Sequence, residues 1–282
     1  MSEAPTPLVM EHGEGRISYH EAGEGYPLFL LHGSGPGVTA WTNFGGNMPV
    51  FARLFRCIAP DLPGYGGSTL PAGDPVAAAV AAIAYMMDRL GIGQAHVIGN
   101  SFGGIVAARF AATYPDKVSR LVTIGGIGVS LFSPFPYEGI DRLVEFVEDP
   151  TREKIVAWLR SMVFDPALVT EEMIETRLAA ATQPEAKETN KRVYSRAGIN
   201  AIAAFMRGPD AVQGFAHLPR ITAPTLLTWG RDDRVNPVDG AMMPMRLIPN
   251  CELHVFPNCG HWAMIEQKAA FEQVVTGFLT RA

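Results

Sequence analysis

Short apolar runs separated by helical stretches dominate the first half of the chain. Residues 47–54 and 74–90 have helical patterning, with Asp74 as an expected N-cap and Gly91 ending the second helix. Residues 15–23 are interpreted as a leading hairpin. Buried strands are predicted at 27–31, 56–60, 95–98 and 118–124. Because strands and helices alternate, the sequence predicts a mainly parallel sheet with helices on both faces.

The pattern changes from about Leu131. A proline-broken apolar loop at 132–137 precedes successive helical stretches over 139–206, and no strand pattern separates them. The remaining predicted elements are strands at 224–230 and 252–256 and a closing amphipathic helix over 263–281. We therefore expect an α/β core that is interrupted by a helical cap. The expected boundaries are 1–131 and 209–282 for the core and 132–208 for the cap.

Ser101 lies where a predicted strand meets a predicted helix. The stretch Gly99-Asn100-Ser101-Phe102-Gly103 matches the G-x-S-x-G pattern of a nucleophile elbow. The flanking glycines let the strand and the helix pass close together around a strained serine. Five-residue patterns also recur by chance in ordinary turns, so the interpretation needs a base and an acid elsewhere in the chain.

A base and an acid follow Ser101 in the order that an elbow serine requires. Of the seven histidines, His261 is the one in a loop just after a late strand. Asp232 and Asp233 follow the strand at 224–230, at the carboxyl end of the predicted sheet, where ligands bind in such folds. We predict Asp233 as the orienting acid, with Asp232 as the alternative, and His261 as the base.

A second glycine-rich loop, residues 32–37, ends the strand at 27–31. It lacks the lysine and the serine or threonine of a phosphate-binding loop. We interpret it as half of an oxyanion hole formed by the backbone amides of Ser34 and Phe102, since fixed donors need no reorganisation during the reaction. A metal site built on Cys259 and His261 lacks further ligands at useful spacing, so no metal is expected.

Composition narrows the partners and the compartment. The 282 residues carry a net charge of −5, and no basic patch or basic amphipathic helix is visible, which argues against nucleic acid and anionic membranes as partners. The first residues are acidic and proline-containing, unlike a signal peptide, and no apolar run could span a bilayer. The three cysteines form no disulfide framework. We expect a cytoplasmic protein.

Four motifs carry a resemblance to a known family over nearly the whole chain. They are Gly33-Ser34-Gly35-Pro36-Gly37 leading to Trp41-Thr42-Asn43, then Gly99-Asn100-Ser101, then residues 128–140, and Gly260-His261-Trp262. With them the chain resembles the meta-cleavage product hydrolases. That resemblance implies an α/β-hydrolase fold with a mostly parallel eight-stranded sheet and an inserted helical cap. It also implies hydrolysis of a carbon–carbon bond, no cofactor, and a homodimer or higher homo-oligomer.

The implied substrate is a 2-hydroxy-6-oxo-hexa-2,4-dienoate-type product of catechol ring opening. Its cleavage gives 2-hydroxypenta-2,4-dienoate and a carboxylic acid in the degradation of aromatic compounds. By resemblance, Asn43, Asn100 and Trp262 complete the polar end of the pocket. A structural asparagine beside an elbow is also common, so for Asn43 a purely structural role stays open.

Arg177 is the best match to the cap arginine that holds the acid group of the substrate in this family. Its own sequence neighbours agree, because the positions three and four residues away are apolar and supply no acidic partner. An arginine on an apolar face must find an anion or extend to solvent. Both outcomes remain open from the sequence.

The alternative function is a carboxylesterase or lactonase on the same fold, and a catalytically silent binding protein is a third hypothesis. An epoxide hydrolase or dehalogenase is disfavoured because those enzymes need a carboxylate where this chain has Ser101. Phe102 and Asn236 could line the side that accepts the variable acyl group. The sequence does not distinguish alkyl from aryl acyl groups, or identify the group that transfers the first proton.

Overall fold

The computed structural model describes residues 5–281, except for the side chains at 184 and 185, and its centre is an eight-stranded sheet. The strand order is β1-β2-β4-β3-β5-β6-β7-β8. The strands are β1 (Leu8–His12), β2 (Gly15–Ala22), β3 (Tyr26–Leu31), β4 (Phe55–Pro60), β5 (Ala95–Asn100), β6 (Val118–Ile124), β7 (Thr225–Gly230) and β8 (Cys251–Phe256). Strands β1, β2 and β4 pair antiparallel, and every other pairing is parallel.

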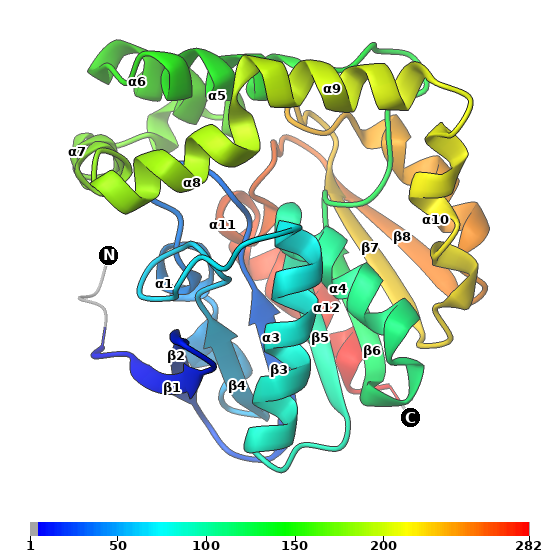
Figure 1. Ribbon diagram of the computed structural model, residues 1–282. Coiled ribbons are helices and arrows are strands. Elements are labelled where there is room, and N and C mark those ends of the chain that lie inside the picture. The colour runs from blue at the N-terminus through cyan, green and yellow to red at the C-terminus, as the bar shows by residue number, and fades with distance from the viewer. Residues whose placement is uncertain (1–4, 282) are drawn as a thin grey trace.

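Helices cover both faces of this sheet, and a separate group lies across the edge where the parallel strands end (Figure 1). The core helices are α1 (Ala40–Phe44), α2 (Met48–Phe51), α3 (Pro75–Arg89), α4 (Phe102–Thr113), α10 (Met242–Leu247), α11 (Ala263–Glu266) and α12 (Lys268–Leu279). The α/β-hydrolase fold with a mostly parallel eight-stranded sheet is thereby confirmed.

Five helices between β6 and β7 form the cap over the carboxyl ends of the strands (Figure 1). They are α5 (Glu138–Glu148), α6 (Arg152–Met162), α7 (Glu171–Ala181), α8 (Pro184–Tyr194) and α9 (Arg196–Arg207). Helices α5 and α6 turn apolar sides inward, and Phe146 and Trp158 are among the largest fully buried side chains. The cap therefore shares its apolar core with the sheet. The domain boundaries 132–208 stay a prediction.

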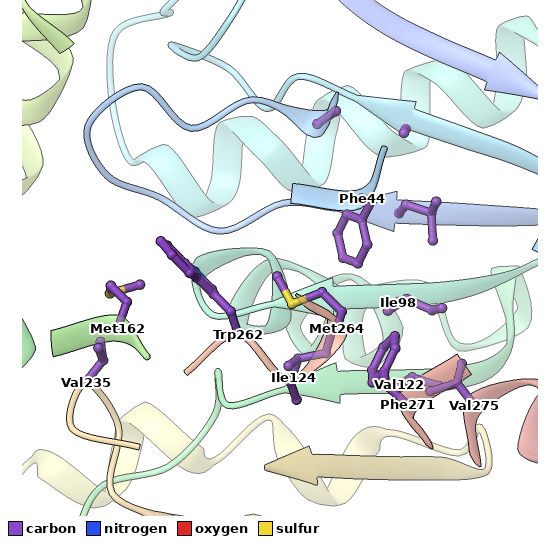
Figure 2. Packing of buried hydrophobic residues seen from close by; sticks show 14 of the residues in the cluster. Phe44, Ile98, Val122, Ile124, Met162, Val235, Trp262, Met264, Phe271 and Val275 are labelled. Carbon is purple, nitrogen blue, oxygen red and sulfur yellow. The ribbon is translucent and has the colours of Figure 1, made fainter. Parts of the chain in front are cut away.

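Two apolar clusters, one on each face, explain why the central strands are nearly continuous hydrophobic runs. Strand β5 is buried at all of its positions. On one face, Ile98 and Val122 belong to the same cluster as Phe271 and Val275 of α12 (Figure 2). Met162, Val235 and Trp262 lie toward one end of that cluster in Figure 2, so the core continues up to the cap.

The first strand departs from the sequence-based expectation. Residues 15–23 were expected to form a hairpin, but they contain the single strand β2, whose hairpin partner is β1. Most positions of β1 are exposed, because it is an edge strand, so its sequence lacks the apolar alternation that marks a half-buried strand. The sequence pattern therefore did not predict β1, because a strand at the edge of the sheet needs no apolar alternation.

Two helix predictions also need correction. The helix expected at 47–54 is shorter in the structure, where α2 spans only Met48–Phe51. Helix α1 precedes it and was not predicted. The expected closing helix breaks at Gln267 into α11 and α12, because Gln267 takes a non-helical conformation and its side chain donates to the carbonyls of Pro257 and Asn258. The N-cap prediction is confirmed, since Asp74 accepts a hydrogen bond from the Ala77 amide at 2.6 Å.

None of the described helices combines the length and the hydropathy needed to cross a bilayer. The expectation about the N-terminal segment falls in part on residues 1–4, which lie outside the described residues.

Candidate active site

Ser101 occupies the sharp turn between β5 and α4, as the elbow pattern predicts. Its backbone is in a rare region for a non-glycine residue, with φ of 51° and ψ of −115°. The flanking glycines permit the turn: a Cβ at Gly99 would lie 2.2 Å from the Gly103 carbonyl oxygen, and one at Gly103 would lie 2.2 Å from the Leu31 carbonyl oxygen. Held in this way, the serine side chain is left partly exposed beneath the cap.

Asp233 and His261 form a buried pair at the ends of β7 and β8. The Nδ1 atom of His261 and the Oδ2 atom of Asp233 are 2.7 Å apart, and each side chain is 1% exposed. The other carboxylate oxygen accepts the backbone amides of Val235 at 2.7 Å and Asn236 at 2.9 Å. These bonds hold the carboxylate in position to orient the imidazole.

The alternative acid, Asp232, points elsewhere. It pairs with Arg231 at 3.2 Å and accepts the Cys259 amide at 3.3 Å. Its side chain is 30% exposed. Between the two aspartates, the geometry favours Asp233.

The second imidazole nitrogen of His261, Nε2, is buried and has no hydrogen-bond partner among the described residues. Two consecutive glycines connect the surroundings of Ser101 with those of His261. A Cβ on Gly126 would come within 2.3 Å of the Ser101 carbonyl oxygen, and Gly125 packs against Asp233 and His261. A free basic nitrogen beside the elbow is what a serine hydroxyl needs for activation.

The loop predicted to supply the oxyanion amide lies against the elbow. A Cβ on Gly33 would lie 3.4 Å from the Ser101 Cβ, so the residue before Ser34 packs against the elbow. Phe102 is the first residue of helix α4, and the centroid of its ring lies 6.5 Å from that of the Tyr65 ring. The two amides predicted for an oxyanion hole thus belong to segments that meet at Ser101.

Asn43 and Asn100 are both buried beside this loop. The Oδ1 atom of Asn43 accepts the Gly33 amide at 2.9 Å, which fixes the start of the loop. The Nδ2 atom of Asn100 donates to the Ile124 carbonyl at 3.3 Å, and its Oδ1 faces Gly33. Asn43 therefore performs the structural role that the sequence left open.

Arg177 is buried in the cap, with 4% of the residue exposed. Its guanidinium donates to the Pro36 carbonyl at 3.4 Å and lies 5.5 Å from the centroid of the Trp262 ring. Among the carboxylates whose side chains the structure describes, none perturbs its pKa or is seen to form an ion pair with it. Burial lowers its pKa to about 10, so the group remains cationic at neutral pH.

A buried cation with mostly unused donors is costly unless an anion joins it. The alternative of an arginine that extends to solvent does not describe this geometry. Trp262, itself 2% exposed, packs between Arg177 and Trp158 and keeps the guanidinium under the cap.

Residues 26–268 match the alpha/beta hydrolase fold family. Among curated proteins, the chain is 40% identical to a 2-hydroxy-6-oxononadienedioate/2-hydroxy-6-oxononatrienedioate hydrolase of Burkholderia vietnamiensis, covering 97% of this chain and 94% of that protein. It is 38% identical to a 2-hydroxy-6-oxo-6-phenylhexa-2,4-dienoate hydrolase of Burkholderia cepacia, covering 94% and 91%. The chain belongs to the meta-cleavage product hydrolases.

Solved structures of this family superpose along nearly the entire chain. A meta-cleavage product hydrolase from Pseudomonas fluorescens IP01 gives a TM-score of 0.83 at 32% identity, with 94% of each chain covered. The 2-hydroxy-6-oxo-6-phenylhexa-2,4-dienoate hydrolase from Rhodococcus sp. strain RHA1 gives 0.85 at 27% identity, covering 98% of this chain and 100% of that one. The match includes the cap of this meta-cleavage product hydrolase.

Sequence reasoning missed the groups that hold the histidine loop of this meta-cleavage product hydrolase. The His261 amide donates to the Met162 carbonyl at the end of α6, at 2.7 Å. One carboxylate oxygen of Glu266 accepts the Gly260 amide at 2.9 Å, and the other accepts the Phe164 amide at 2.7 Å. The link that Glu266 makes to the cap has no local pattern, because Phe164 lies 102 positions earlier in the chain.

Asn236 also has a role that the sequence did not reveal. Its side-chain amide donates to the Gly125 carbonyl at 2.6 Å, and its backbone carbonyl accepts the Trp229 indole N–H at 2.7 Å. Gly125, at a φ of +54°, is the residue that packs on Asp233 and His261. Asn236 thus braces the acid–base pair from two directions.

Among the described residues, no group of three or more His, Cys, Asp or Glu side chains could hold a metal ion.

Proposed function

We propose that Ser101, His261 and Asp233 act as nucleophile, base and orienting acid, and that the amides of Ser34 and Phe102 bind the oxyanion. The observation that carries this proposal is the buried Asp233–His261 pair, whose Nε2 is unbonded beside a strained elbow serine. As a meta-cleavage product hydrolase, the chain cleaves a carbon–carbon bond during the degradation of aromatic compounds.

The substrate is a 2-hydroxy-6-oxo-hexa-2,4-dienoate whose terminal acyl group varies. Arg177 of the cap contacts Trp262 and the Pro36 carbonyl of the core, and the side chains that the structure describes leave most of its guanidinium donors unused. The carboxylate and the 2-oxygen of a dienoate match these donors in charge and geometry. Asn100, beside the elbow, completes the polar end of the site.

The first stage is ketonisation. A proton adds to C5 as the 2-hydroxyl group loses its own, which converts the dienol into a 2,6-diketone. This change matters because the C5–C6 bond then adjoins a ketone that can be attacked and a carbon chain that can accept an electron pair.

The second stage is acyl transfer. His261 takes the proton of Ser101 as its oxygen attacks C6, and negative charge collects on the former ketone oxygen between the two amides. Collapse of this intermediate breaks the C5–C6 bond, and the electron pair moves through the chain to the 2-oxygen. Protonation then gives 2-hydroxypenta-2,4-dienoate.

Water completes the cycle. His261 deprotonates a water molecule that attacks the acyl-serine, and the carboxylic acid leaves as Ser101 recovers its proton. Each step uses only protein groups and water, so we propose that neither a metal nor a cofactor takes part.

We also propose that the chain acts in the cytoplasm as a homodimer or larger homo-oligomer. All three cysteines are free thiols, as a reducing compartment maintains them. Light scattering coupled to size-exclusion chromatography tests the assembly, and a monomer at micromolar concentration would contradict it.

A panel of ring-fission products that differ only in the terminal group, with methyl, phenyl and carboxyethyl variants, tests the reaction. The wild-type protein should release 2-hydroxypenta-2,4-dienoate from at least one of them. S101A should release it at least about 1,000-fold more slowly, whereas S133A, on an exposed loop, should match the wild type.

The ester-hydrolase alternative has a distinct outcome. It would show fast turnover of p-nitrophenyl esters, no cleavage of any ring-fission product, and no response to R177Q. Release of the dienoate by S101A at the wild-type rate would overturn the serine mechanism.

A further inference from the structure

Three helices of the cap touch consecutive residues of the loop that carries the proposed oxyanion amide. From α8, the Tyr194 hydroxyl hydrogen-bonds the Ser34 hydroxyl. From α6, the Trp158 ring packs on Gly35, where a Cβ would lie 2.9 Å from the indole. From α7, Arg177 reaches the Pro36 carbonyl at 3.4 Å. The loop therefore lies between the sheet and the cap.

The loop has little means of fixing itself. Glycines stand at positions 33, 35 and 37, and Gly35 and Gly37 have φ values of +120° and +65°. A glycine-rich segment has a weak conformational preference of its own, so outside contacts must fix its amides. From the core, the Asn43 side chain accepts the amide of Gly33, one residue before the proposed oxyanion amide of Ser34.

Ser34 itself is held by two phenols. The Tyr65 hydroxyl interacts with the Ser34 side chain and with the Gly35 backbone, and burial raises the pKa of Tyr65 well above its usual value. Burial also raises the pKa of Tyr194, so both phenols stay protonated and neutral at working pH. Tyr65 belongs to the core and Tyr194 to the cap, and Ser34 joins them.

We propose that Tyr194 is a positioning residue for the oxyanion hole, acting through the Ser34 hydroxyl so that docking of α8 sets the Ser34 amide. The proposal rests on the proposed function for the role of that amide. A preorganised donor accelerates the step in which charge develops, and a small displacement of it is expensive. Loss of the Tyr194 hydroxyl should therefore slow attack on the ketone and leave ketonisation nearly unchanged.

Stopped-flow kinetics of Y194F separates the two stages. Loss of the dienolate absorbance reports ketonisation, and appearance of 2-hydroxypenta-2,4-dienoate reports bond cleavage. Cleavage by Y194F should slow about 5- to 10-fold, the effect of one lost hydrogen bond, with KM and the rate of dienolate loss within about twofold of wild type. Y114F, on a tyrosine that packs on Phe110 of α4, should behave as wild type in both signals.

A double-mutant cycle tests whether Tyr194 acts through the Ser34 hydroxyl. S34A removes the contacts of the Ser34 hydroxyl with both phenols and keeps the amide, so S34A and the double variant should show the same loss of cleavage rate, and that loss should be at least as large as the loss in Y194F. If the losses multiply, or if Y194F cleaves at the wild-type rate, the proposal is wrong. Should Y194F fail to fold, as judged by its thermal transition, S34A alone gives the same comparison from the core side.

An ester substrate makes the test independent of the natural reaction. Hydrolysis of p-nitrophenyl acetate needs the oxyanion hole but has no ketonisation stage, so Y194F and S34A should lower its kcat by the same factor as cleavage. If the wild type hydrolyses the ester but no ring-fission product, the proposed function fails while the positioning proposal is still tested. Equal ester kcat values for wild type, Y194F and S34A would overturn the positioning role.

Discussion

The core and the cap surround the candidate active site with different kinds of contact. On the core side, each polar group of the acid has a partner: Asp233 accepts two backbone amides and binds His261. On the cap side, Arg177 makes one long hydrogen bond to a backbone carbonyl and rests on the Trp262 ring. The core thus fixes the Asp233–His261 pair through several hydrogen bonds, while the described contacts of Arg177 use few of its donors, which we propose bind the substrate.

The two parts are nevertheless joined at the site. The end of α6 accepts the His261 amide, and Glu266 of α11 accepts the Phe164 amide of the cap. Arg234 in the acid loop donates to the Val163 carbonyl at 3.1 Å. The cap is therefore anchored to the acid and histidine loops on one flank, and it meets the oxyanion loop on the other.

The largest effect is expected from a substitution in the core, at the acid of the Asp233–His261 pair. D233N should lower kcat for cleavage by about 1,000- to 10,000-fold, because an amide cannot stabilise the imidazolium or select the productive tautomer. D232N should stay within a few-fold of wild type, since Asp232 faces Arg231 and the Cys259 amide. Steady-state kinetics on one ring-fission product decides between them, and the reverse order would make Asp232 the acid.

A smaller effect is expected when the cap loses its charge. R177Q should lower kcat/KM for the dienoate by about 100-fold, because a buried anion–cation contact disappears. Its kcat/KM for p-nitrophenyl acetate, which has no carboxylate, should change by less than about twofold. R152Q, which removes an exposed cap arginine paired with Glu171 and Glu175, is the control and should leave both values unchanged.

Equal losses on both substrates would mean that Arg177 acts structurally. The burial of its guanidinium gives a second readout. Because its pKa is lowered to about 10, KM for the dienoate should rise as the pH approaches 10, where the free enzyme loses this charge. The KM of the uncharged ester should not follow that rise.

Bracing of the pair by Asn236 should have an intermediate effect. N236V deletes the bond to the Gly125 carbonyl and should cost about 1 kcal/mol of unfolding free energy. A thermal midpoint lower by about 2–4 °C is expected for a chain of this size. A several-fold fall in kcat without a change in KM would show that Gly125 transmits the loss to His261. A stability loss with unchanged kcat would limit Asn236 to a structural role.

The smallest expected effect is the loss of stability in acid that buried histidines cause. It concerns the core alone, because the cap helices, residues 138–207, contain no histidine. His96 is buried, and its Nδ1 atom lies 2.7 Å from the Ser119 hydroxyl oxygen. Burial lowers the pKa of His96 from 6.5 to about 4. The unfolded chain takes up a proton below pH 6.5 while the folded chain resists until pH 4. Stability is therefore full above pH 6.5 and falls as the pH drops toward 4.

Thermal midpoints at pH 7.5 and pH 5.0 test this contribution. H96Q should lose less between the two pH values than the wild type, by a few degrees. An identical loss in both proteins would show that His96 does not contribute to acid instability. His217, whose pKa burial also lowers to about 4, should account for part of the remainder.

The elbow and the order of the site residues were readable in the sequence because they are local signals. Glycines 99 and 103 around Ser101 report a turn that tolerates no side chain, and His261 follows a strand-like run near the end of the chain. The break of the last helix at Gln267 was not readable, because the partners of Gln267 are carbonyls of the preceding loop.

Other features depend on packing between distant segments. A preference for Asp233 over Asp232 rests on which carboxylate meets His261, 28 positions away. The burial of Arg177 depends on a loop 141 positions earlier in the chain. The bracing by Glu266 and the contact of Tyr194 with Ser34 have no local signature at all.

By itself the sequence determined the alternation of strands and helices, the strained serine and the supply of an acid and a base in workable order. Those properties follow from apolar periodicity and from glycine positions, which act over a few residues. Only the tertiary structure decided which donors are left unused and which loop the cap holds in place. Hydrogen-bond satisfaction and burial are properties of groups brought together across the whole chain, so they exist only once the cap has packed on the sheet.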